Sequence, residues 1–146
     1  MNLTTDTTPP ETAAMAHILQ HCRSVAVVGL SPKAHRDSHE VAQYMQQHGW
    51  RIIPINPNAS SILGETAYPS LTAAAKHEHI ELVNVFRNSA DVPPVVDEAI
   101  AIGTTALWLQ LGVFHDAAAA QARAAGMMVV QNKCLMVEYA RSLRTG

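Results

Sequence analysis

Short apolar runs alternate along this chain with longer segments whose apolar residues recur every three or four positions. Runs of four or five apolar residues bounded by turn residues are typical of strands that are buried on both faces. We therefore predict five strands, at residues 24–28, 51–55, 82–86, 106–109 and 127–130.

The segments between these runs have the spacing of amphipathic helices. The predicted helices are residues 12–22, a stretch from 37 or 38 to Gly49, a short turn at 71–76, a stretch from 89 or 91 to Gly103, a stretch from Asp116 to Gly126, and residues 135–143. Asp37 or Ser38 is expected to cap the second helix, with Glu40 completing a capping box, and Asp116 is expected to cap the fifth.

Strands that alternate with helices of about ten residues indicate parallel βαβ units with right-handed crossovers. The predicted fold class is therefore α/β, a Rossmann-like open parallel five-stranded sheet with helices on both faces. Pro54 lies in the second strand and lacks a backbone donor, so we expect that strand to be short.

The length of the chain, 146 residues, is that of one ordinary domain. Residues 1–10 are rich in threonine and proline and have no apolar period, which predicts a flexible tail. We expect residues 11–146 to form a single domain.

Charge and composition narrow the classes of partner. The chain has 10 Lys and Arg against 12 Asp and Glu, a formal net charge of -2, so we expect no nucleic-acid partner. It contains no apolar run long enough to cross a membrane, and its start lacks the regions of a secretory signal. We therefore expect a cytoplasmic location, no membrane partner, and reduced thiols at Cys22 and Cys134.

The loop after the first predicted strand is a candidate phosphate site. In an open parallel sheet, ligands bind beyond the carboxyl ends of the strands, near the point where the strand order reverses. Here a single glycine, Gly29, is followed by Ser31, Lys33 and Arg36. Glycine lets the main chain approach a phosphate, the helix start favours an anion, and two cations suit a ligand with more than two phosphate charges. The alternative is a solvated surface loop.

The residues that follow the next two strands also indicate which kind of ligand binds. An NAD site usually has an acidic residue after its second strand, whereas this chain has Asn56 and Pro57. Arg87 directly follows an apolar strand, which favours an anionic ligand, with an ion pair as the alternative. We therefore expect a multiply phosphorylated nucleotide, and a small NAD(P)-binding oxidoreductase remains the competing hypothesis.

Other chemistry has weaker support in the sequence. Paired carboxylates and a nucleophile elbow are absent, so we assign no catalytic residue. His17 and His21 are spaced to share a helix face but have no third ligand close in sequence, so we predict no metal site. Cys134 follows the last strand near the expected cleft. Two roles are consistent with this position, a reactive thiol and a small buried thiol.

Several motifs together carry a family resemblance. They are VVGLS at 27–31 with Arg36 and Ser38, GWRIIPINP at 49–57, VNVFRNSADVPPVVDEAI at 83–100, and LWLQLGV at 107–113. This pattern resembles the small stand-alone coenzyme A-binding proteins, which are similar to the N-terminal CoA-binding domain of the succinyl-CoA synthetase alpha subunit. The resemblance covers roughly residues 15–143. The loop from Gln131 to Cys134 departs from the pattern, which has an aspartate and an arginine before the cysteine.

The resemblance implies a site for coenzyme A or an acyl-CoA. The loop residues Gly29, Leu30, Ser31, Lys33, Arg36 and Ser38 would meet the pyrophosphate or the 3'-phosphate, Asn56 and Pro57 the adenosine half, Phe86, Arg87 and Asn88 the nucleotide cleft, and Gln110 and Leu111 the pantetheine arm. The implied function is a binding, carrier or sensor module without catalytic machinery of its own. The other possibility is the CoA-binding subunit of a split acyl-CoA ligase, which requires a separate ATP-grasp chain.

Overall fold

The computed structural model describes residues 10–145. The predicted tail lies outside the described residues except for Pro10, with which the first helix begins. The elements in chain order are α1 (Pro10–His21), β1 (Ser24–Val28), α2 (Asp37–Gln47), β2 (Arg51–Ile55), β3 (Ser61–Ile62), β4 (Glu65–Thr66), α3 (Leu71–Ala75), β5 (Leu82–Val85), the 3-10 turn η1 (Ser89–Asp91), α4 (Val92–Ala101), β6 (Ala106–Leu109), α5 (Asp116–Ala124), β7 (Met128–Val130) and α6 (Leu135–Arg144). Within these residues no helix has the length and apolar character that crossing a bilayer requires.

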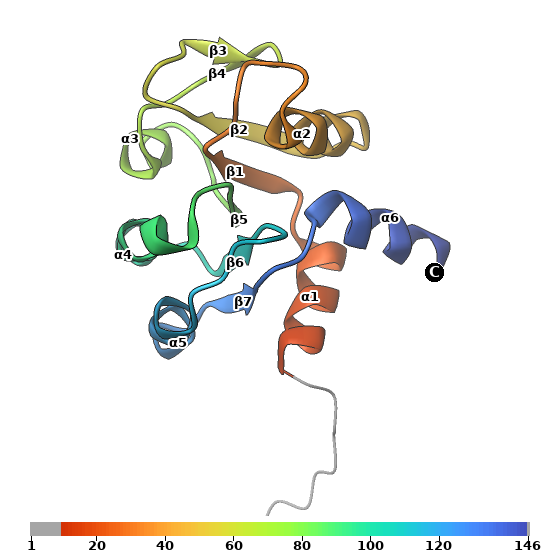
Figure 1. The fold of residues 1–146 in the computed structure, drawn as a ribbon, viewed down its shortest axis with the longest axis vertical. Coiled ribbons are helices and arrows are strands. Elements are labelled where there is room, and N and C mark those ends of the chain that lie inside the picture. Colours follow the sequence, from red (N-terminus) through yellow and green to blue (C-terminus); the bar gives the residue numbers. More distant parts are fainter. Residues whose placement is uncertain (1–9, 146) are drawn as a thin grey trace, which may run out of the picture.

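The five predicted strands form one parallel sheet in the order β2-β1-β5-β6-β7. The chain runs outward from β1 to β2, returns to β5 on the other side of β1, and continues to β7 (Figure 1). The strand order therefore reverses between β1 and β5, as in other doubly wound folds. The predicted Rossmann-like fold is confirmed.

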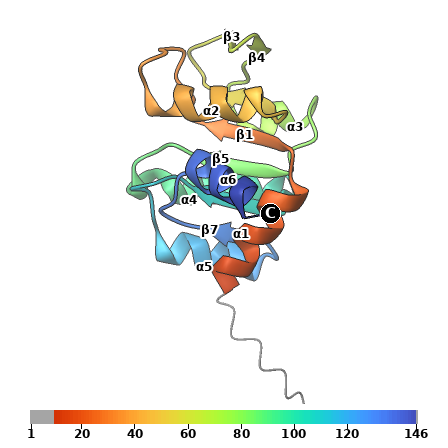
Figure 2. The same ribbon diagram turned by 90° about the vertical axis from the view of Figure 1, so that its right-hand side faces the viewer.

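Helices cover both faces of the sheet. α3, α4 and α5 lie on one face and α1, α2 and α6 on the other, and Figure 2 looks onto the second face. Because strand side chains alternate between faces, Ala26 and Val28 pack on the first face while Val25 and Val27 pack on the second. Trp108, which is fully buried, is among the largest side chains of the second core.

β2 has the predicted bounds, residues 51–55, although it contains Pro54. It keeps five residues, and Pro54 is tolerated because β2 is an edge strand. Near the carboxyl end of β2 the backbone at Tyr68 covers the outer side, where Tyr68 N donates to Pro54 O at 2.9 Å and Asn56 N donates to Tyr68 O at 2.9 Å. This backbone segment therefore covers the open edge of β2 near the carboxyl ends of the strands.

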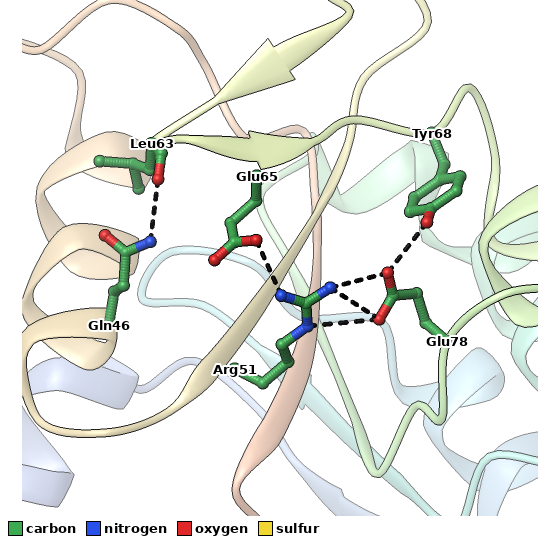
Figure 3. A network of polar contacts seen from close by, with 6 residues as sticks. All are labelled: Gln46, Arg51, Leu63, Glu65, Tyr68 and Glu78. Carbon is green, nitrogen blue, oxygen red and sulfur yellow. Dashed lines mark hydrogen bonds and ion pairs between the residues drawn. The ribbon is translucent and has the colours of Figure 1, made fainter.

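A small antiparallel hairpin of β3 and β4 lies beside this edge (Figure 3). The sequence pattern did not predict this hairpin. Gln46 Nε2 of α2 donates to Leu63 O at 2.9 Å, and the Arg51 guanidinium binds the carboxylates of Glu65 and Glu78, each at 2.8 Å. Strands of two residues are too short to show a period of their own, and side chains from other elements hold this hairpin in position.

The cap of α2 differs from the prediction. Arg36 is the N-cap and makes no side-chain hydrogen bond to the first turn. The hydroxyl of Ser38 accepts instead from Ser31 N at 3.0 Å, while Asp37 and Glu40 lie inside the helix. The predicted capping box is therefore wrong, because the loop before the helix takes the serine oxygen.

The start of α4 agrees with the prediction, whereas the cap of α5 differs from it by one residue. α4 follows the turn η1 and has Asp91 at its N-cap without a side-chain bond. The N-cap of α5 is His115, whose Nδ1 accepts from Ala118 N at 3.1 Å, and Asp116 is the first helical residue. The predicted cap at Asp116 is wrong by one position, since an imidazole nitrogen accepts the bond in place of a carboxylate.

Candidate functional site

A single glycine lets β1 and β5 come together at the point where the strand order reverses. Gly29 has a φ of +87°, and a Cβ atom at this position would lie 2.2 Å from the carbonyl oxygen of Phe86. On either side, Gly29 N donates to Ile55 O at 3.1 Å and Phe86 N donates to Val28 O at 2.8 Å. The packing of two main chains therefore requires this glycine, whether or not a phosphate also approaches it.

The loop after Gly29 is ordered by its own serine hydroxyls. Ser38 Oγ accepts from Ser31 N at 3.0 Å, and Ser31 Oγ accepts from Lys33 N at 3.1 Å. A hydroxyl that accepts in this way still has its hydrogen available as a donor. Both serines can therefore hold the loop and donate to an anionic ligand at the same time.

This loop borders a cavity of about 570 Å³, which we name the loop cavity. Its lining residues are Gly29, Ser31, Lys33, His35, Arg36, Asp37, Ser38 and Phe86. Lys33 and Arg36 bring two cations to it, and Asp37 brings one carboxylate. Its charges favour an anion, with the first turn of α2 alongside.

A second, larger cavity of about 710 Å³ extends across the ends of β5 and β6 to the start of α6, and we name it the main cavity. Its lining residues are Arg36, Asp37, Glu40, Val41, Phe86, Arg87, Asn88, Asp91, Gln110, Leu111, Val113, Cys134 and Met136. Three residues, Arg36, Asp37 and Phe86, line both cavities. Together the two cavities form one cleft across the reversal point, which we name the switch-point cleft.

Two arginines in this cleft have no carboxylate partner. Within residues 10–145, the arginines in ion pairs are Arg51 and Arg141, and neither Arg36 nor Arg87 is among them. Both guanidinium groups line the main cavity and are exposed. A guanidinium fork matches the geometry of a phosphate, so this pair is suited to a phosphorylated ligand.

The far end of the main cavity, after β6, is less polar. Gln110 is buried, with 6% of its surface exposed, and its Oε1 accepts from Leu135 N at 3.4 Å. Its Nε2 has no acceptor among the described residues. Leu111, Cys134 and Met136 line the cavity around it. This end therefore combines an available amide donor with apolar side chains and a thiol.

Three of the residues implied by the resemblance do not line either cavity. Leu30 is fully buried in the core, so only its backbone is near the loop. Asn56 Nδ2 donates to Leu30 O at 2.9 Å, and Asn56 Oδ1 accepts from Asn58 N at 2.7 Å. Asn56 thus ties the end of β2 to the loop after β1, and a contact of Asn56 or Pro57 with an adenosine stays a prediction.

The loop before α6, which departs from the family pattern, is held by hydrogen bonds to the end of β6 and the loop after it. Asn132 adopts a φ of +57°, a conformation that asparagine tolerates better than most residues, and its Oδ1 accepts from Gly112 N at 2.7 Å. Lys133 accepts at its carbonyl from Trp108 Nε1 at 2.8 Å, while its Nζ lies 3.9 Å from a carboxylate oxygen of Glu11. The ammonium group of Lys133 therefore points toward α1, and Lys133 lines neither cavity.

Several lining residues were not expected from the sequence. They are Glu40, Val41, Asp91 and Met136. All lie in the first two turns of a helix that follows a strand, or directly before such a helix. The first turn of a helix that follows a strand lies at the same edge of a parallel sheet, so extending each candidate loop by one turn would have included them.

Other side-chain chemistry is sparse in the described part of the chain. Between residues 10 and 145 no group of three or more His, Cys, Asp or Glu side chains is placed to hold a metal ion. Cys22 and Cys134 are both free thiols. Burial, reinforced by the negative charge of Glu81, raises the pKa of Cys22 to about 11.

Comparison with known proteins identifies the family. A model described as "CoA binding domain" matches residues 23–140, and the chain belongs to this family. The Bacillus subtilis protein YneT is 36% identical over 131 residues, which are 90% of this chain and 96% of YneT. A solved protein from Pyrococcus horikoshii is 32% identical with a TM-score of 0.85, covering 98% of this chain and 99% of that one.

The fold also occurs within larger enzymes. An acetyl-coenzyme A synthetase from Ca. Korarchaeum cryptofilum, solved with phosphate and ADP, matches 80% of this chain with a TM-score of 0.70 and 20% identity. The match covers 27% of the synthetase chain, and at this identity it shows the shared fold alone. The predicted resemblance to CoA-binding proteins is confirmed by the family match.

Proposed function

We propose that this protein binds coenzyme A in the switch-point cleft and acts as a binding, carrier or sensor module without catalytic machinery of its own. The observation that carries the proposal is a pair of arginines, Arg36 and Arg87, that form no ion pair within residues 10–145 and lie beside the loop after β1 in a chain of the CoA binding domain family. Coenzyme A carries a pyrophosphate and a 3'-phosphate, which these groups are suited to bind.

The shape of the cleft suits the two halves of the ligand. The phosphates would lie between the loop cavity and the arginines, where Ser31 and Ser38 also have hydroxyl hydrogens to donate. The pantetheine arm would run along the ends of β5 and β6 to Gln110 and Leu111. A cytoplasmic location stays a prediction from the sequence.

Two competing functions have less support. NAD binding would favour an acidic residue after β2, where Asn56 instead uses its side chain to hold the loop and the following turn. A CoA-binding subunit of a split ligase is consistent with the fold of the synthetase from Ca. Korarchaeum cryptofilum, and copurification of an ATP-grasp chain would support it.

The arginines give a direct test of the proposed function. Replacing Arg36 or Arg87 with alanine should weaken coenzyme A by about 10- to 100-fold, since a hydrogen bond to a charged group contributes about 1.5–3 kcal/mol. The stability of the unliganded protein should not change, because neither side chain forms an ion pair with the rest of residues 10–145. Isothermal titration calorimetry measures the affinity, and urea unfolding measures the stability.

The control is Arg123→Ala, which removes an exposed arginine of α5 that lies outside the cleft. Coenzyme A should bind this variant as it binds the natural protein. Equal affinity in the Arg36, Arg87 and Arg123 variants would remove the basis of the proposed site.

A further inference from the structure

Two exposed apolar side chains belong to the loop after β6, which borders one end of the switch-point cleft. Among the described residues the large apolar side chains that remain exposed are Leu111, Phe114, Val137 and Leu143. Leu111 and Phe114, which are 67% and 55% exposed, both belong to the loop between β6 and α5. Leu111 lines the main cavity, and Phe114, whose N donates to Ser89 Oγ at 3.0 Å, follows three residues later in the same loop. A ligand that fills the main cavity would cover the exposed side chain of Leu111.

The charged residues of the cleft lie elsewhere along it. Lys33, Arg36 and Asp37 line the loop cavity, and Arg87 lies next to the end of β5 in the main cavity, which also has the carboxylates of Glu40 and Asp91 in its lining. Within residues 10–145 none of the three cations is in an ion pair, so each is available to an anionic group of a ligand. The lining near the end of β6 and the start of α6 is uncharged and consists of Gln110, Leu111, Val113, Cys134 and Met136. A ligand that fits the whole cleft therefore has an anionic head and continues into an uncharged, partly apolar portion.

Gln110 adds a specific requirement at the uncharged end. Its side chain is 6% exposed, its oxygen already accepts from Leu135 N, and its Nε2 has no acceptor among residues 10–145. Nε2 is not among the fully buried polar atoms that lack a partner, so it is accessible and can donate to a carbonyl oxygen of the ligand. The portion of the ligand that reaches Gln110 is therefore expected to carry a carbonyl.

We propose that the preferred ligand is an acyl thioester of coenzyme A, with its acyl chain lying over Leu111 and Phe114 and Gln110 Nε2 donating to a carbonyl oxygen near the start of that chain. This inference rests on the proposed function, because the nucleotide half must occupy the charged part of the cleft. The inference names a class of ligand, apolar acyl thioesters, and a subsite that binds the acyl chain.

The test is the dependence of affinity on chain length. Calorimetry with coenzyme A and with its acetyl, butanoyl and octanoyl thioesters, each below its micelle concentration, gives four dissociation constants. A fully buried methylene contributes about 0.8 kcal/mol, or roughly fourfold in affinity, so two covered methylenes give about 14-fold. Octanoyl-CoA should therefore bind at least about tenfold more tightly than acetyl-CoA.

Matched variants separate the subsite from unspecific apolar binding. Phe114→Ser should flatten the dependence on chain length, because it removes an apolar side chain outside the phosphate part of the cleft. Leu143→Ser removes a similarly exposed side chain, 54% exposed, in the last turn of α6 beside a different cavity, and should leave the dependence intact. Leu111→Ser is a second variant that should reduce the dependence of affinity on chain length. The measured quantity is the ratio of the affinities for octanoyl-CoA and acetyl-CoA.

The outcomes distinguish this inference from the proposed function. Equal affinities for coenzyme A and all three thioesters, or flattening by Leu143→Ser to the same extent as by Phe114→Ser, would overturn the acyl subsite and leave coenzyme A binding in place. Absence of binding by coenzyme A and by every thioester would overturn the proposed function itself. A chain-length dependence that Phe114→Ser and Leu111→Ser abolish and Leu143→Ser retains would establish the subsite.

Discussion

Replacing Gly29 with alanine should destabilise the protein more than the same change at Gly126. Both glycines have positive φ values, +87° and +93°, which an alanine adopts only with strain. They differ in their surroundings, since a Cβ atom at Gly29 would lie 2.2 Å from Phe86 O, whereas a Cβ at Gly126 would have no atom within 4 Å. The comparison therefore separates backbone strain from the contact between β1 and β5.

The expected magnitudes follow from these two contributions. A left-handed conformation costs a non-glycine residue about 1–2 kcal/mol, which is the expected loss of stability for Gly126→Ala. Gly29→Ala adds an overpacked contact that costs about 1–3 kcal/mol more, because a backbone carbonyl must move. The total for Gly29→Ala is about 2–5 kcal/mol, and the displacement of Phe86 should also weaken coenzyme A, since Arg87 follows directly.

Urea unfolding of the natural protein and both variants, followed by circular dichroism, gives the free energies of unfolding. Calorimetric titration of coenzyme A into each folded protein then gives the affinities. If Gly29→Ala lost no more stability than Gly126→Ala, the close approach of the two strand ends would not be the reason for the single glycine of this loop.

Two further predictions concern the amino ends of β1 and β5 and the thiols. Burial of Glu81 opposes its ionisation, but backbone donors from Arg23 and Ser24, at 2.8 Å and 2.9 Å, hold its pKa below the ordinary value. A lowered folded-state pKa gives stability that is present above the unfolded-state pKa and lost as the pH falls through the folded-state pKa. Glu81→Gln should thus reduce the loss of unfolding free energy between about pH 6 and about pH 3 in urea titrations, and an unchanged pH dependence would contradict this role. Iodoacetamide should modify Cys22 only after unfolding, because the thiol is buried and its pKa is raised to about 11, and it should modify Cys134 in the native protein unless coenzyme A fills the cleft. Mass spectrometry of the labelled peptides checks both statements, and unprotected labelling of Cys134 at saturating coenzyme A would remove it from the ligand-binding region.

The fold was predictable because its pattern is local. Each of the five strands is a short apolar run, and the helices between them repeat their apolar residues at helical spacing, so the parallel sheet follows from their alternation. Helix caps were less predictable where neighbouring polar side chains compete. Ser38 bonds to the amide of Ser31 rather than to its own helix, and His115 takes the cap expected of Asp116.

The candidate site was predictable in outline for a topological reason. The carboxyl ends of parallel strands meet at one edge, so Lys33, Arg87 and Gln110 could be grouped before any coordinates were known. The use of Asn56 to hold Leu30 was not predictable, because its partner lies in another loop 26 positions away. The same holds for the turn of Lys133 toward α1, which depends on a carboxylate near the start of the chain.

The central claim is that the switch-point cleft binds coenzyme A, and thermal unfolding of the ligand-free protein with a panel of nucleotides tests it most directly. A ligand that binds only the folded state adds about 2.7 kcal/mol at 100 times its dissociation constant, which is readily measured as a rise in Tm. At matched concentrations and salt, coenzyme A should raise the Tm, dephospho-CoA should raise it less because it lacks the 3'-phosphate, and NAD and NADP should leave it unchanged. A rise with NAD or NADP alone, or no rise with coenzyme A, would contradict the claim.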